Sequence, residues 1–159
     1  PESLPSWILP LIVIIAAAAI VLLALAMRKP VIEQAFLIYK DGALLAHTTN
    51  RMIPEMDSQI FSSMFTAIQD FIKDSFKDEK NWSLDKLEFG DNKIFIARGK
   101  DGLYSLSLIY RGRDRGLQSI SRKAIEAVDK AYGKEFKDWD GNMDRFRGVR
   151  DVLSDSIFK

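Results

Sequence analysis

The chain has 159 residues, with 23 lysines and arginines against 22 aspartates and glutamates, and its formal net charge is +1. Because positive and negative residues are nearly equal in number and are interspersed, the charge pattern indicates neither a nucleic-acid-binding protein nor an acidic disordered tail. The chain has no cysteine, which excludes a disulfide framework, thiolate zinc sites and cysteine nucleophiles.

An uncharged apolar run, WILPLIVIIAAAAIVLLALAM, covers residues 7–27. A helix of roughly 20 such residues spans the hydrocarbon core of a bilayer, so the run predicts a transmembrane helix. The alternative is a cleavable signal peptide, since Ala24, Leu25 and Ala26 resemble a small-x-small cleavage site. The run is longer than a signal h-region of roughly 7–15 residues and no basic residue precedes it, which favours the anchor.

The charges beside the run predict its orientation. Glu2 is the only ionisable side chain before it, whereas Arg28 and Lys29 follow at once, and basic residues tend to stay on the cytoplasmic side. We therefore expect a single-pass protein of the cell membrane with an extracellular stub (1–6), a transmembrane helix (7–27), a juxtamembrane linker (28–34) and a cytoplasmic domain (35–159).

The cytoplasmic part opens with a predicted β-hairpin. Residues 35–39 (AFLIY) and 43–47 (ALLAH) flank Lys40, Asp41 and Gly42, and glycine can take the positive φ of a tight turn. The first strand is apolar on both faces, which predicts either a central strand covered on both faces or a strand that abuts the other partner of the hairpin.

A helix is predicted after Pro54, with Asp57 as its N-cap. Apolar residues recur there at steps of three and four, which is typical of one helix face packed on a sheet. We expect this whole stripe to belong to the core: Ile60, Phe61, Met64, Phe65, Ile68, Phe71 and Ile72.

Three strands and two helices are predicted in the second half of the chain. The strands are residues 84–89, 93–98 and 103–110, joined by glycine-containing turns. A helix follows, marked by apolar residues from Leu117 to Ala131 and expected to end at Gly133. A short last helix runs from about Phe146 to Ile157. The soluble part is thus predicted to be an α+β domain of order β-β-α-β-β-β-α-α.

This element order resembles that of the longin domain and of the related roadblock and profilin-like folds, in which helices pack on a five-stranded antiparallel sheet. The resemblance covers residues 32–158. The segments FLIYKDG and MFTAIQDFIKDSF also resemble membrane-tethered cytoplasmic domains of archaeal membrane proteins. The resemblance implies docking surfaces for small GTPases, for SNARE-type or transport partners, or for a second copy of the chain.

No motif indicates catalysis or a cofactor. The sequence lacks GxxxxGK[ST], GxGxxG after a strand, HExxH and GxSxG. The single histidine, His47, cannot form a histidine-based metal site and is interpreted as a structural or surface residue. Asp138, Asp140 and Asp144 lack the register of a calcium loop and are interpreted as caps and turns. We expect no enzyme activity, cofactor, metal or nucleic-acid partner.

Basic residues near the second long helix are the candidate binding site. Arg111, Arg113 and Arg115 precede this helix and Arg122 and Lys123 lie in its early turns, although a helix N-terminus prefers negative charge. An anion, such as a lipid phosphate or a partner carboxylate, would relieve this conflict. Arg28 and Lys29 would add to the same field at a membrane. The alternative is that these side chains are simply solvated.

These observations predict a non-catalytic, membrane-anchored interaction module that docks a protein partner or dimerises at the membrane surface. The alternative is a sensor that relays a signal from an extracellular domain or binds a small ligand. A deep apolar pocket would favour the sensor, and a flat apolar patch or exposed sheet edge would favour docking.

Overall fold

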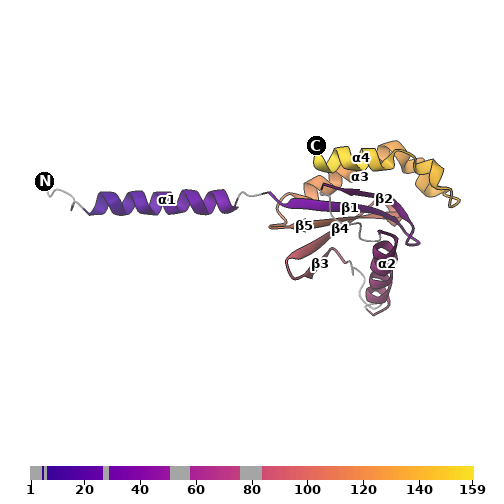
Figure 1. The fold of residues 1–159 in the computed structure, drawn as a ribbon, viewed down its shortest axis with the longest axis horizontal. Coiled ribbons are helices and arrows are strands. Elements are labelled where there is room, and N and C mark those ends of the chain that lie inside the picture. Colours follow the sequence, from indigo (N-terminus) through magenta and orange to yellow (C-terminus); the bar gives the residue numbers. More distant parts are fainter. Residues whose placement is uncertain (1–4, 6, 27–28, 51–57, 76–83) are drawn as a thin grey trace.

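The computed structural model describes residues 5, 7–26, 29–50, 58–75 and 84–159. A lone N-terminal helix, α1 (Ile8–Ala26), is followed by a five-stranded sheet with helices on both faces (Figure 1). No residue of α1 is buried, and both hydrophobic cores are built from later residues.

The sheet is antiparallel throughout, with strand order β2-β1-β5-β4-β3. Its strands are β1 (Val31–Tyr39), β2 (Leu44–Thr49), β3 (Lys86–Phe89), β4 (Asn92–Arg98) and β5 (Tyr104–Arg111). The predicted hairpin and three-strand meander are therefore confirmed, as is the α+β class.

The first strand is longer than the sequence indicated. β1 starts at Val31, which lies opposite Arg111 of β5, so residues 31–34 of the expected linker belong to the sheet. The linker boundary was wrong because these residues pair with β5, a strand more than 70 positions away, and their local pattern does not reveal that pairing. Ile32 and Gln34 are buried in consequence.

Helices cover the two faces unequally. α3 (Leu117–Lys137) and α4 (Val149–Phe158) pack on one face, and α2 (Ser58–Ser75) lies on the other (Figure 1). Side chains of β1 point alternately to the two faces of the sheet and so contribute to both cores. Ala35, Leu37 and Tyr39 face α3 and α4, and Phe36 and Ile38 face α2. β1 is thus the doubly covered strand that its composition predicted.

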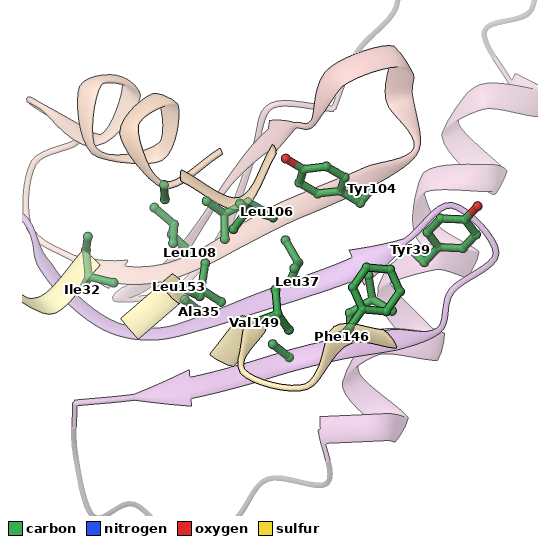
Figure 2. Close-up of a cluster of buried hydrophobic side chains, with 14 of the residues drawn as sticks. Ile32, Ala35, Leu37, Tyr39, Tyr104, Leu106, Leu108, Phe146, Val149 and Leu153 are labelled. Atoms are coloured by element: carbon green, nitrogen blue, oxygen red, sulfur yellow. The ribbon is translucent and has the colours of Figure 1, made fainter. Parts of the chain in front are cut away.

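The larger core lies between the sheet and the two C-terminal helices. Figure 2 shows Leu37 and Leu106 of the sheet beside Val149 and Leu153 of α4, with Phe146 near Tyr39. Aromatic contacts close the end of this core at which β1 ends: Phe136 of α3 lies 4.2 Å from the Tyr104 ring and 4.9 Å from the Phe146 ring, measured between centroids.

These contacts explain why α3 runs past Gly133, where we expected it to end. Continuing the helix places Phe136 in the core, where only 1% of it is exposed. A buried phenylalanine is worth about 1.5–3 kcal/mol, more than the roughly 0.5–1 kcal/mol that glycine costs inside a helix. The expected N-cap of α2, Asp57, lies outside the described residues.

Candidate interaction surface

An open apolar groove lies between α2 and the β3–β4 side of the sheet; we call it the α2–β3 groove. Its volume is about 440 Å³. Its floor includes Phe65, Ile94 and Ile109, which are 1%, 5% and 8% exposed. Its rim includes Met64 and Phe89, which are 51% and 54% exposed. A half-exposed apolar rim marks a shallow surface site and not an enclosed ligand pocket.

The groove exists because α2 buries only part of its apolar face. Phe61 and Phe65 are buried, and the Phe61 ring stacks on Phe36 with centroids 4.3 Å apart. Ser62 is also fully buried and donates a 2.7 Å hydrogen bond to the carbonyl of Gly42. These two contacts turn the helix toward β1 and the turn that joins it to β2.

The prediction that the whole stripe of α2 is core was therefore wrong. Phe61 and Phe65 are buried as expected, and Ile68 and Ile72 are half-buried, but Ile60, Met64 and Phe71 are 65%, 51% and 71% exposed. Met64 lies about 100° around the helix from Phe65, because one turn holds 3.6 residues. The apolar arc of α2 is thus wider than one sheet face covers, and this width was the sequence signal for the groove.

The β3 strand forms an edge of the sheet beside this groove, and no described strand pairs with its outer side. Leu87 and Phe89 line the groove. Lys86 and Glu88 project to the opposite face, where the ammonium of Lys86 lies 2.7 Å from the Glu88 carboxylate and 3.2 Å from that of Asp114.

This charge cluster sets the local electrostatics of the edge. Hydrogen bonds from Lys86 are the main reason that the pKa values of Glu88 and Asp114 lie below their usual range. Reciprocally, the bonds to Glu88 and then Asp114 raise the pKa of Lys86. All three groups therefore stay charged across the neutral range.

Some of the predicted basic residues form ion pairs in the structure, and others do not. Arg111 ends β5 and lies at one end of the groove, where its Nε is 3.0 Å from the carboxylate of Glu33. Glu33 is only 4% exposed, so this ion pair is half-buried. This ion pair was not predicted from the sequence, because Glu33 fell within the expected linker.

Arg113 and Arg115 are exposed in the loop between β5 and α3, and no ion pair is found for either among the described residues. The Arg122 Nε lies 4.0 Å from Glu126 on the exposed side of α3, and Lys123 is exposed nearby. Lys29 is exposed beside β1, and Arg28 lies outside the described residues. Asp114 precedes α3, and its backbone carbonyl accepts a hydrogen bond from the Leu117 N–H.

The remaining candidate residues have structural contacts. The His47 ring stacks on Phe36 and lies within 3.0 Å of Gln34 and Ser58. The carboxylate of Asp140 accepts the Asn142 N–H in a turn. The described residues include no group of three or more His, Cys, Asp or Glu side chains placed to hold a metal ion.

No family model and no curated protein matches the sequence. Among solved structures, MglB of Myxococcus xanthus superposes with a TM-score of 0.53 at 16% identity, covering 65% of this chain and 85% of that protein. A roadblock/LC7 domain from Streptomyces avermitilis gives a TM-score of 0.52 at 13% identity, covering 67% and 90%. Neither of these structures is named as an archaeal protein, so the archaeal resemblance stays a prediction. At such identities the likeness concerns the fold, and the part of this chain that follows α1 has a roadblock/longin-like fold.

Proposed function

We propose that this chain is a membrane-anchored, non-catalytic interaction module that pairs with a second copy of itself through β3 and the α2–β3 groove. The observation that carries the proposal is the composition of the β3 edge. Apolar side chains occupy its groove face, and one lysine and one glutamate occupy its other face.

This edge is complementary to itself. If two β3 strands pair antiparallel about Leu87, each Lys86 lies opposite Glu88 of the second copy, and opposite charges across strands are stabilising. The two Leu87 side chains meet on the groove face. The rims formed by Met64 and Phe89 then lie beside the same interface and lose water together, which drives association. A protein that exposes such an edge alone risks unspecific pairing.

The helix α1 supports the anchoring part of the proposal. It has 19 residues, a mean hydropathy of 3.2 and no buried side chain. A helix of this length spans about 28 Å, close to the thickness of the bilayer hydrocarbon core. Tethering two copies to one membrane would also raise their effective concentration and favour pairing through a small edge.

Self-pairing is tested with a single cysteine, because the chain has none of its own. The Leu87→Cys variant of the full chain in vesicles should form an intermolecular disulfide on mild oxidation, since directly opposed Cβ atoms lie about 4.5–5.5 Å apart in an antiparallel pair. A Lys130→Cys variant on the exposed side of α3 is the matched control and should form no intermolecular disulfide, although its β3 edge is unchanged.

Charge variants sharpen the test. Adding Glu88→Lys to Leu87→Cys places like charges across the edge and should reduce disulfide formation, and adding Lys86→Glu to that variant should restore it. Equal disulfide yield in all variants, or none in Leu87→Cys, would contradict pairing through β3. The groove would then be left for a different protein, such as the small GTPase that the fold resemblance implies.

The anchor and its orientation are tested separately. The full chain should float with vesicles and resist carbonate extraction, whereas a cleaved signal sequence would release the domain. In sealed cells Lys130→Cys should react with an impermeant thiol reagent only after lysis, because Arg28 and Lys29 favour the cytoplasmic side. Reaction without lysis would reverse the orientation.

A further inference from the structure

The sheet end at which β1 begins is tied closely to the end of α1. At this end Val31 of β1 lies opposite Arg111 of β5, Tyr110 of β5 lies opposite Lys93 of β4, and Asn92 of β4 lies opposite Phe89 of β3. The turn between β3 and β4, which holds Gly90 and Asp91, therefore lies at the same end (Figure 1). Four residues lie between Ala26 and Val31. The five steps along the chain extend at most about 3.6 Å each, so the distance between Ala26 and Val31 is at most about 18 Å.

The loop between β5 and α3 lies at this end and carries positive charge in excess. Arg111 is engaged by Glu33, and Asp114 by Lys86. Arg113 and Arg115 are exposed, without an ion pair among the described residues. The ammonium of Lys93 donates a 3.1 Å hydrogen bond to the carbonyl of Gly112, which holds the start of the loop against β4.

We propose that this end of the sheet rests on an anionic phospholipid surface, with Arg113, Arg115 and Lys29 directed at the lipid headgroups. The inference rests on the proposed anchoring by α1. It adds a fixed orientation of the domain, in which β3 and the α2–β3 groove stand at the side of the sheet, available to a neighbouring copy on the same membrane.

Distance and charge both support this contact. The headgroup layer extends about 5–8 Å beyond the hydrocarbon core, so a linker of at most about 18 Å leaves the sheet end no more than roughly 13 Å from it. The loop residues extend beyond the end of β5 and shorten this distance. Charges within a Debye length of about 8 Å feel the negative surface potential of anionic lipids.

The test measures lipid contact at the β3–β4 turn. A fluorophore on Asp91→Cys of the full chain would be quenched by nitroxide-labelled headgroups in phosphatidylcholine vesicles with or without phosphatidylserine. We expect stronger quenching with phosphatidylserine, and weaker quenching as salt rises. Replacing Arg113 and Arg115 by glutamine should lower the contact equilibrium roughly 5-fold for each arginine, since a basic residue near such a surface contributes about 1 kcal/mol.

A matched control removes the same charge elsewhere. Lys130→Gln with Lys134→Gln changes two exposed lysines about 20 Å or more from the start of α3, and should leave the quenching unchanged. Equal quenching in the two vesicle types, or in the double arginine variant and the parent at low salt, would overturn the inference while leaving the anchor intact. A chain that does not float with vesicles would overturn both proposals.

Discussion

The hydroxyl of Tyr104 links the sheet to α3 at the residue scale. The side chain is only 2% exposed, and its hydroxyl donates a 2.8 Å hydrogen bond to the carboxylate of Asp129. Burial, and then this hydrogen bond, raise the pKa of Tyr104 above its ordinary value of 10.0. The folded state therefore favours the neutral phenol more strongly than the unfolded state does.

The Tyr104→Phe variant should show both consequences. Losing the hydrogen bond should lower the free energy of unfolding by about 1–2 kcal/mol at neutral pH. Because the folded pKa is raised, the contribution of the neutral phenol is complete below the unfolded pKa of about 10 and is lost as pH rises above it. Urea unfolding at rising pH should thus show a steeper loss of stability in the parent than in the variant. Parallel pH profiles would contradict the assigned burial of this hydroxyl.

Adjacent residues of α2 test its half-covered face at the element scale. Phe65 is 1% exposed and Met64 is 51% exposed. In the isolated monomer Phe65→Ala should lower the free energy of unfolding by about 3–5 kcal/mol, as truncation of a packed aromatic does. Met64→Ala should change it by less than about 1 kcal/mol, because its side chain keeps half its contact with water. Similar losses for the two variants, measured by urea unfolding, would mean that α2 is turned differently.

Two glycines of α3 provide a second matched pair. Gly133 lies inside the helix, and a Cβ there would meet no atom within 4 Å, so Gly133→Ala should stabilise the domain by about 0.5–1 kcal/mol. Gly116 precedes the helix at φ +90 with equally open space. Gly116→Ala should instead destabilise by about 1–2 kcal/mol, because an L side chain is strained at positive φ. The melting temperatures of both variants, measured by thermal unfolding, test the comparison. Shifts of the same sign in the two melting temperatures would contradict a helix that continues through Gly133.

At the scale of the whole molecule, the domain is structurally independent of α1. Both cores are formed by residues from Ile32 onward, and no side chain of α1 is buried against them. A fragment of residues 30–159 should therefore fold in water and unfold at the same urea concentration as the domain of the full chain in micelles. A fragment that lacks a cooperative transition would show that α1 contributes to the core.

The sequence by itself determined the membrane-length apolar helix, the order of the strands and helices along the chain, and the burial of β1 on both faces. These features depend on composition and on short-range periodicity, and neighbouring residues specify them. The interpretation of Asp140 as a turn residue depends on equally local information, since its carboxylate accepts the N–H of Asn142 two positions along the chain.

Only the tertiary structure decided the rest. The start of β1 at Val31 depends on pairing with β5, the continuation of α3 past Gly133 depends on the burial of Phe136, and the exposure of Met64 depends on how α2 turns toward β1 and β2. The edge position of β3, and the pairing of Arg111 with Glu33, likewise join residues far apart in the chain. Packing between segments that are distant in the chain decides such features. Local propensity and periodicity do not show which distant segment a residue will contact.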